Sequence, residues 1–305
     1  RTNRYRTATE VQNEFEWAYP EGKMLRERFI EIIKATAPEG SDERIKYESQ
    51  IAGLANYAKN FTSMIEFYGK STMLADRKAL EAKLAEWIAK DSSREAKYGK
   101  TLAELDALIA KSKAHQERDM ILSYISSTTM LPTATNLYRL AHEKQLPDMQ
   151  REPGFQDRDM TRFKASMERI DRRYAASVDK AVLLDMLKRY AALPEAQRLP
   201  AMDKAFGIDN KVNEAKLAKT LDKMYAKTEL GNKDVRLAWM EKSVDDFKAS
   251  KDPFIQFAVA MYDTNMSEEK KEKELDGELM KVRPQYMDAI IAYNLEQGKP
   301  VYADA

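Results

Sequence analysis

The feature that most constrains the fold is a long helical pattern from about Ser41 to Tyr68, roughly 40 Å at 1.5 Å per residue. Apolar residues recur along it at alternating steps of four and three, the spacing of a helix face that packs against other helices. The residues of this face are Tyr47, Ile51, Leu54, Ala58, Phe61, Ile65 and Tyr68. The pattern predicts a central helix with other helices packed against it.

A second face of the same helix is small, amide-bearing and uncharged. At the 33% charged content of the whole chain, residues 49–65 would carry about five or six charges, but they hold only Lys59. A glycine within a helix costs about 1 kcal/mol relative to alanine and commonly marks a close approach. Two explanations stay open: the helix is buried on both sides with its amides bonded internally, or this face meets something other than bulk solvent. Its residues are Ser49, Gly53, Asn56, Asn60 and Ser63.

Composition excludes several classes of protein. The 51 basic and 50 acidic residues are balanced, so no basic field favours nucleic acid. No run approaches eighteen apolar residues, so no membrane span is expected. The absence of cysteine excludes a disulfide framework, a thiol nucleophile and a zinc ribbon, but leaves the compartment open. Only ten glycines in 305 residues, against a usual ~7%, favour an all-helical chain.

The expected architecture is a single all-α domain over residues 1–305, an antiparallel helical bundle with long helical hairpins. Two prolines, a glycine and several charges interrupt the pattern near 147–159, where we expect a break between two sub-bundles. A long helical run is expected over 101–126 and separate helices over 253–263, 267–281 and 284–297. Gly69 is expected to end the central helix.

No pattern for catalysis or for a cofactor is present. The chain has two histidines, His115 and His142, and each lies in a helical segment where a surface or rim position is the simpler interpretation. No H-E-x-x-H or G-x-S-x-G motif occurs. We therefore expect no catalytic residue, no metal site and no cofactor. From its residues alone, the chain is a helical binding, lid or scaffold domain without a self-contained active site.

Several segments are more specific than their periodicity. They are RTNRYRT at 1–7, LANYAKN at 54–60, REPGFQDRD at 151–159, DPFIQFA at 252–258 and PVYADA at 300–305. Together they resemble the helical domain of exported bacterial dipeptidyl aminopeptidases related to dipeptidyl peptidases 7 and 11, over essentially the whole chain. The resemblance implies a chymotrypsin-like double β-barrel with a Ser–His–Asp triad, into which the helical domain is inserted. The barrel and the triad would then lie outside this chain.

The resemblance also implies a role for the uncharged face. In that family the helical domain caps the active-site cleft, and an asparagine helps bind the free α-amino group of the peptide. By motif this residue is Asn56, Asn60 is a weaker candidate one turn later, and Gly53 would permit close approach of substrate or barrel. A homodimer of the full enzyme and a periplasmic or cell-surface location are implied by resemblance only. The alternative is a stand-alone helical scaffold or adaptor for a protein partner, which predicts no barrel coding sequence on either side.

Overall fold

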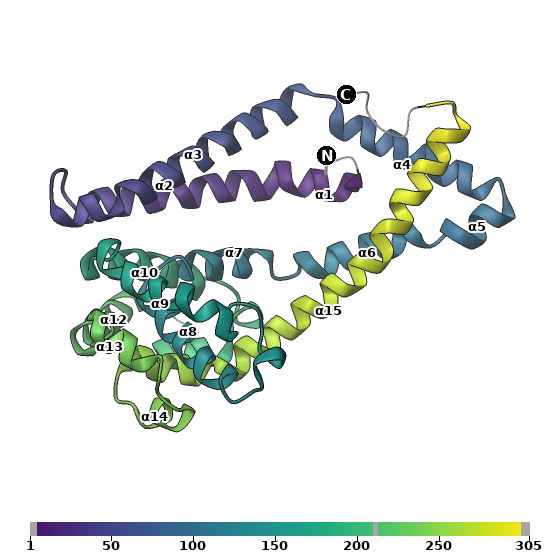
Figure 1. Cartoon of the computed structure of the whole chain (residues 1–305). Coiled ribbons are helices and arrows are strands. Elements are labelled where there is room, and N and C mark those ends of the chain that lie inside the picture. Colours follow the sequence, from purple (N-terminus) through teal and green to yellow (C-terminus); the bar gives the residue numbers. More distant parts are fainter. Residues whose placement is uncertain (1–4, 210–212, 300–305) are drawn as a thin grey trace. The chain divides into compact units, whose positions relative to one another are not determined.

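The computed structural model describes residues 5–209 and 213–299, and within these ranges every regular element is a helix. The all-α prediction is confirmed (Figure 1). The α-helices are α1 Ala8–Asn13, α2 Tyr19–Thr36, α3 Asp42–Lys70, α4 Met73–Ala89, α5 Ser92–Tyr98, α6 Thr101–Lys113, α7 Gln116–Ile125, α8 Met130–Glu143, α9 Met160–Arg169, α10 Ala176–Ala191, α11 Pro200–Phe206, α12 Glu214–Lys227, α13 Lys233–Trp239, α14 Val244–Ala249 and α15 Pro253–Glu296. A π-helix, η2 Glu14–Ala18, joins α1 to α2, and the 3-10 turns are η3 Asp148–Gln150, η4 Asp157–Asp159, η5 Ile170–Arg172 and η6 Glu195–Gln197.

The chain divides into two compact units. Unit 1 contains the described residues within 1–26, 56–116 and 268–305, and unit 2 contains those within 27–55 and 117–267. Helices α2, α3, α7 and α15 each contribute residues to both units. The segment 147–159 lies inside unit 2, and the expected division into sub-bundles there stays a prediction.

Unit 1 is built on a core that combines α4, α5 and α6 with the last part of α15. Its buried residues include Trp87, Tyr98, Leu105, Tyr286 and Ile290. Two aromatic residues of this core also form hydrogen bonds at its edge. The Trp87 indole N–H donates to Glu296 at 2.8 Å, and the Tyr98 hydroxyl donates to Asp288 at 2.8 Å. Residues about 200 positions apart in sequence thus form one core.

The first and last helices of the described chain are tied together in unit 1. Thr7 and Glu10 form a capping box at the start of α1, which satisfies two helix-terminal N–H groups. Glu81 on α4 accepts from the Ala8 N–H at 2.8 Å and from the Tyr286 hydroxyl at 2.9 Å, and burial raises the pKa of its carboxyl. Arg283 on α15 binds Glu10 at 2.7 Å. Helices α1 and α15 therefore belong to the same packed unit.

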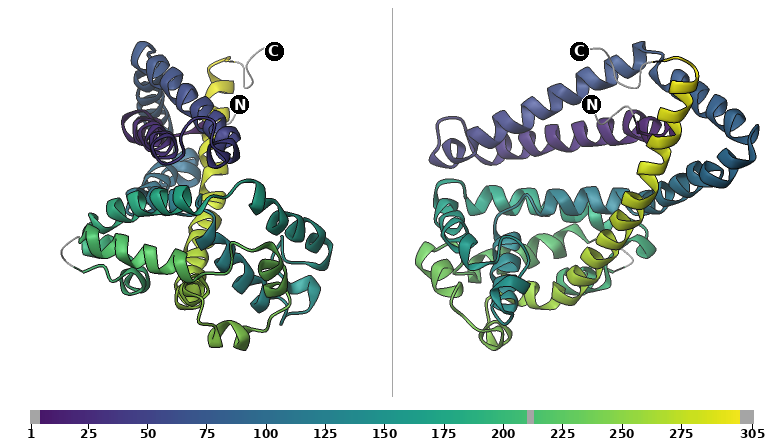
Figure 2. Two further views of the ribbon diagram at one scale, coloured as in Figure 1. Left: turned by 90° about the vertical axis from the view of Figure 1, so that its left-hand side faces the viewer. Right: turned by 45° about the vertical axis from the view of Figure 1, so that its right-hand side comes forward.

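Helices α8 and α10 form the centre of unit 2, and their inward residues are almost completely buried. In α10 these include Val178, Val182, Leu183, Met186 and Leu187. Helix α12 packs along α10 (Figure 2), with Leu217 and Leu221 buried and salt bridges Lys180–Asp222 and Lys188–Glu214 at 2.6 Å. These surface ion pairs contribute little, so burial of the apolar faces holds the two helices together.

Three predicted helix boundaries are wrong. Gly69 lies inside α3, which ends at Lys70. The run over 101–126 is divided into α6 and α7 by a turn at Ala114–His115, where neither glycine nor proline signals a break. The three helices expected after residue 253 form one helix, α15, with Pro284 inside it. Proline removes one backbone hydrogen bond, but the residues just after it, including Tyr286 and Ile290, are buried in the unit 1 core and hold the helix together.

Candidate functional site

The outer face of α3 in unit 1 is formed by Asn56, Asn60, Ser63 and Phe67. At 3.6 residues per turn these side chains project within about 60° of one another. All four are exposed, and the large apolar ring of Phe67 is 49% exposed. On the opposite side of the helix, Ala58 is buried. The explanation in which both faces are buried is therefore wrong for this chain.

The two asparagines of this outer face present free amides. Within the described chain, neither Asn56 nor Asn60 has a side-chain hydrogen-bond partner. An exposed amide oxygen can accept from an ammonium group without introducing charge, and its N–H₂ can donate to a carbonyl. The outer face therefore offers two uncharged amides, and its one hydroxyl, on Ser63, donates to the Lys59 carbonyl at 3.2 Å.

Close packing of α2 on α3 fixes the orientation of this face. The Tyr19 ring lies 5.3 Å from the Phe61 ring and 6.1 Å from the Tyr68 ring. Burial, together with Glu14, raises the pKa of Tyr19 to about 12. A Cβ added to Gly22 would lie 2.8 Å from Phe61, so this glycine is where α2 approaches α3. The rigid aromatic contact keeps the apolar face inward and the amide face outward.

A guanidinium group lies beside the outer face. The Arg26 guanidinium is stacked 4.6 Å from the Phe61 ring centroid and 5.4 Å from that of Tyr57, and it also donates to the Gly22 carbonyl at 2.9 Å. Tyr57 is 56% exposed and follows Asn56 directly. The aromatic contacts hold this cation against the helix. The sequence pattern did not identify Arg26, because its aromatic partners lie more than thirty residues away.

At its C-terminal end the outer face continues into a shallow hollow. This hollow has a volume of about 370 Å³ and is lined by Ser63, Glu66, Phe67, Lys70 and Ser71. The Ser71 hydroxyl is buried and has no partner within the described chain. The hollow therefore combines an apolar ring, both signs of charge and a buried hydroxyl without a partner in the described chain.

Gly53, which belongs to unit 2, has no neighbour that requires a glycine. It is exposed, and a Cβ built at this position would have no atom within 4 Å. Gly53→Ala should therefore raise the free energy of unfolding by about 0.5–1 kcal/mol through helix propensity alone. Gly22→Ala is the matched control, because the clash with Phe61 should cancel that gain. Urea denaturation of both variants measures the difference, and destabilisation by Gly53→Ala would contradict the open surroundings of this residue.

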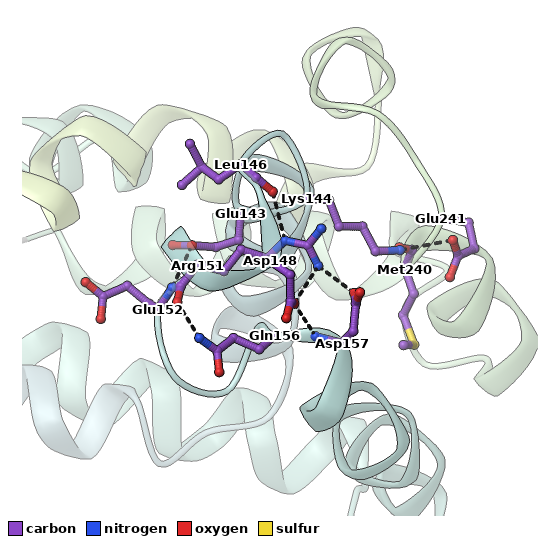
Figure 3. Close-up of polar contacts among 10 residues, drawn as sticks. All are labelled: Glu143, Lys144, Leu146, Asp148, Arg151, Glu152, Gln156, Asp157, Met240 and Glu241. Atoms are coloured by element: carbon purple, nitrogen blue, oxygen red, sulfur yellow. Dashed lines mark hydrogen bonds and ion pairs between the residues drawn. The ribbon is translucent and has the colours of Figure 1, made fainter.

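The segment 146–157, which includes most of the REPGFQDRD motif, is a loop held by Arg151 (Figure 3). The guanidinium donates to the Leu146 carbonyl at 3.1 Å and to Asp157 at 2.7 Å, and lies 3.5 Å from Asp148. Asp148 also accepts from the Asp157 backbone N–H at 2.6 Å. The Arg151 guanidinium thus links the start of the loop at Leu146 to its end at Asp157.

A buried carboxylate anchors this loop to α8. Glu143 accepts from the Arg139 guanidinium at 2.6 Å and from the backbone N–H of Glu152 at 3.0 Å. Gly154 adopts φ 98°, a left-handed conformation that favours glycine, and donates its N–H to Asp159 at 2.8 Å. The side chains of Arg151, Asp157 and Asp159 are thus used in holding the loop, which gives these residues of the motif a structural role.

Both histidines are half-buried, and each has one ring nitrogen that is buried without a partner in the described chain. His142 stacks on Tyr262 at 3.9 Å between ring centroids, and burial lowers its pKa. In the described ranges no group of histidine and carboxylate side chains could hold a metal ion. Among the described helices, none combines the length and apolar content of a membrane span. In the part of the chain that the structure describes, the outer face of α3 thus presents exposed amides, a hydroxyl and an aromatic ring on an all-helical scaffold.

This domain belongs to a known family of peptidases. The family model described as Peptidase S46 matches residues 1–305. The chain is therefore a member of peptidase family S46, in agreement with the resemblance seen in its motifs.

Relatives with assigned activities cover the chain to different extents. An Asp/Glu-specific dipeptidyl-peptidase of Shewanella putrefaciens is 36% identical over 304 residues, which is 100% of this chain and 41% of that protein. A dipeptidyl-peptidase 7 of Capnocytophaga gingivalis is 27% identical over 195 residues, 63% of this chain and 26% of that protein. A dipeptidyl-peptidase 7 of Porphyromonas endodontalis is 35% identical over 145 residues, 47% of this chain and 16% of that protein. The chain thus spans less than half the length of these relatives.

Proposed function

We propose that this chain is the helical lid or regulatory domain of a serine dipeptidyl peptidase, an enzyme that removes dipeptides from the free N-terminus of peptides. Membership of family S46 and the dipeptidyl-peptidase relatives support the class of reaction. The observation that carries the assignment to a lid is the outer face of α3, which exposes two unpaired amides and almost no charge.

In this proposal Asn56 accepts a hydrogen bond from the substrate α-ammonium group through its side-chain oxygen. An exopeptidase that releases dipeptides has to fix the distance between that amine and the scissile bond, and a single oriented acceptor on a rigid helix does so. Asn60 lies one turn further on and is a weaker candidate for the same contact. The exposed backbone at Gly53 leaves room for substrate or for the catalytic domain to approach.

The catalytic groups would come from a β-barrel domain outside this chain, with the helical domain inserted in it. The pairing of α1 with α15 through Glu81 and through Glu10–Arg283 supports this arrangement, since an inserted domain has to return the chain close to its entry point. Closure of the domain over a bound peptide would exclude water and complete the amine site. The family resemblance adds a homodimer and export to the periplasm or cell surface.

The proposal is tested by following dipeptide release by mass spectrometry. The 305-residue chain alone should not cleave any peptide, whereas the longer protein that contains it should release dipeptides from peptides with a free amine. Acetylation of the substrate amine should abolish release by the longer protein. Turnover by the 305-residue chain, or equal cleavage of acetylated peptides, would contradict the proposal. If the chain is instead part of an adaptor without a peptidase domain, neither the 305-residue chain nor the longer protein should release dipeptides.

A further inference from the structure

The side chain of His142, on α8, lies in an aromatic cluster of unit 2. Its ring is stacked on that of Tyr262 from α15, with the ring centroids 3.9 Å apart and the planes inclined by 12°. The Tyr138 ring is nearly perpendicular to it at 4.7 Å, and Tyr138 also contacts Phe247 of α14, with ring centroids 5.2 Å apart. His142 therefore lies where α8 packs against both α14 and the first part of α15.

One nitrogen of this ring is enclosed without a hydrogen-bond partner. The Nε2 atom of His142 is buried, and no other group of the described chain bonds to it. A neutral imidazole carries one N–H, whereas an imidazolium carries N–H on both nitrogens. Whichever nitrogen takes the proton, Nε2 becomes a charged donor that is buried without an acceptor. Burial of such a group is more unfavourable than burial of a neutral one.

The nearest carboxylate on the same helix is not available as this acceptor. Glu143 follows His142 directly, but one of its oxygens accepts from the Arg139 guanidinium at 2.6 Å. The other oxygen accepts from the backbone N–H of Glu152 at 3.0 Å. Protonated His142 could bond to Glu143 only by displacing one of the contacts that hold the loop 146–157 to α8.

Four charged side chains face the ring from three helices: Arg139 and Glu143 on α8, Lys248 on α14 and Asp263 on α15. Burial lowers the pKa of His142, Lys248 and Arg139 lower it further, and the two carboxylates only partly oppose them. Both Lys248 and Asp263 are exposed. Burial, Tyr262, Asp263 and Asp245 raise the pKa of Tyr138, so its hydroxyl stays neutral in acid. Among these neighbours, the environment thus favours the neutral ring.

Helix α14 is the element that can respond to a change at this ring. It is six residues long and buries Val244 and Phe247, and the Phe247 ring packs between those of Tyr138 and Trp239. Hydrogen bonds from Ser243 at the helix N-terminus lower the pKa of Asp246, so this cap stays ionised between about pH 7.5 and 5.5. A short helix with few buried residues opens more easily than the core.

We propose that protonation of His142 loosens α14 and the first part of α15 from α8, so that unit 2 opens locally in mild acid. The sign follows from linkage. A histidine whose pKa in the packed state lies below its ordinary value of 6.5 leaves the packing at full stability above that pH, and destabilises it as the pH falls further. This pH-sensitive device goes beyond the proposed function and does not depend on the reaction catalysed.

Hydrogen exchange of the 305-residue chain tests the proposal, with rates corrected for their intrinsic pH dependence. Between about pH 7.5 and 5.5 the opening of residues 244–249 should rise about three- to tenfold, the range that one proton allows. His142→Phe keeps a ring on Tyr262 but does not titrate, so the rise should stay below about 1.5-fold. His142→Gln, which is neutral and smaller, should give the same result even if the phenylalanine ring does not fit.

His115→Phe is the matched control, because His115 lies in unit 1, and this variant should keep the full acid response of residues 244–249. NMR titration of the two histidine rings, assigned by the signal that His142→Phe removes, should give His142 a pKa below 6.5. The proposal would be overturned by an opening that does not rise in the unmodified chain, by an equal rise in both His142 variants, or by a His142 pKa at or above 6.5. None of these results bears on peptidase activity.

Discussion

Arg236→Ala is expected to lower the free energy of unfolding by about 3–5 kcal/mol, a large share of the stability of an ordinary domain. The Arg236 side chain is completely buried in unit 2. Its guanidinium donates to the Met167 carbonyl at 3.0 Å and to the Leu230 and Gly231 carbonyls at 2.8 Å, and it also binds Asp171. Alanine would leave three carbonyl groups and the Asp171 carboxylate without their donor and a cavity in place of the side chain, so α9 would lose its connection to the loop before α13.

Urea denaturation followed by circular dichroism measures this loss. Arg158→Ala is the control, because Arg158 is exposed, and its effect should stay below about 0.5 kcal/mol. Arg236→Lys should fall between the two, since lysine keeps the charge but lacks the planar fork that reaches several carbonyls. A loss below about 1 kcal/mol for Arg236→Ala would mean that these hydrogen bonds are not formed in solution.

Asp179→Ala should lower the free energy of unfolding by about 2–4 kcal/mol. This carboxylate is 3% exposed and accepts from the backbone N–H groups of Thr129 at 2.5 Å and Met130 at 3.2 Å, and from the Tyr225 hydroxyl at 2.7 Å. It therefore satisfies the N-terminus of α8, which carries no cap from its own N-cap residue. Alanine would leave these donors buried without an acceptor.

Two further substitutions separate the contribution of charge from that of hydrogen bonding. Burial raises the pKa of the Asp179 carboxyl, so the neutral amide of Asp179→Asn should be tolerated better than alanine. Asp222→Ala, which removes an exposed salt bridge with Lys180, should cost less than about 1 kcal/mol. Thermal unfolding of the three variants checks the order, and an Asp179→Ala protein as stable as Asp222→Ala would contradict the capping role.

Periodicity predicted the helical content and the two faces of α3. The apolar side is directed inward, and Asn56 and Asn60 are exposed. Periodicity could not predict where one helix continues past a local signal for its end. Pro284 is a strong local signal for a helix end, but the burial of Tyr286 and Ile290 against residues from α4 to α6 overrides it. That burial depends on contacts almost 200 residues apart, which a local pattern does not contain.

The sequence pattern could not predict the two buried polar residues of unit 2, Arg236 and Asp179, either. Arg236 stands in a charged helical segment and resembles a surface residue until Met167 and Leu230 are brought around it. Asp179 lies 50 residues from the helix terminus that it caps. The candidate amine ligand was found differently: periodicity identified the uncharged face, but only the LANYAKN motif singled out Asn56 within it.

The most direct test of the central claim is kcat/KM of the intact peptidase for a dipeptidyl substrate, with and without Asn56→Ala. A hydrogen bond to a charged group contributes about 1.5–3 kcal/mol, so loss of the amine contact predicts a fall of roughly 10- to 150-fold. Asn60→Ala on the same face is the control and should have a smaller effect. If Asn56→Ala leaves stability unchanged and lowers kcat/KM by this amount, Asn56 binds the substrate. If kcat/KM stays within about twofold, the outer face of α3 does not hold the amine.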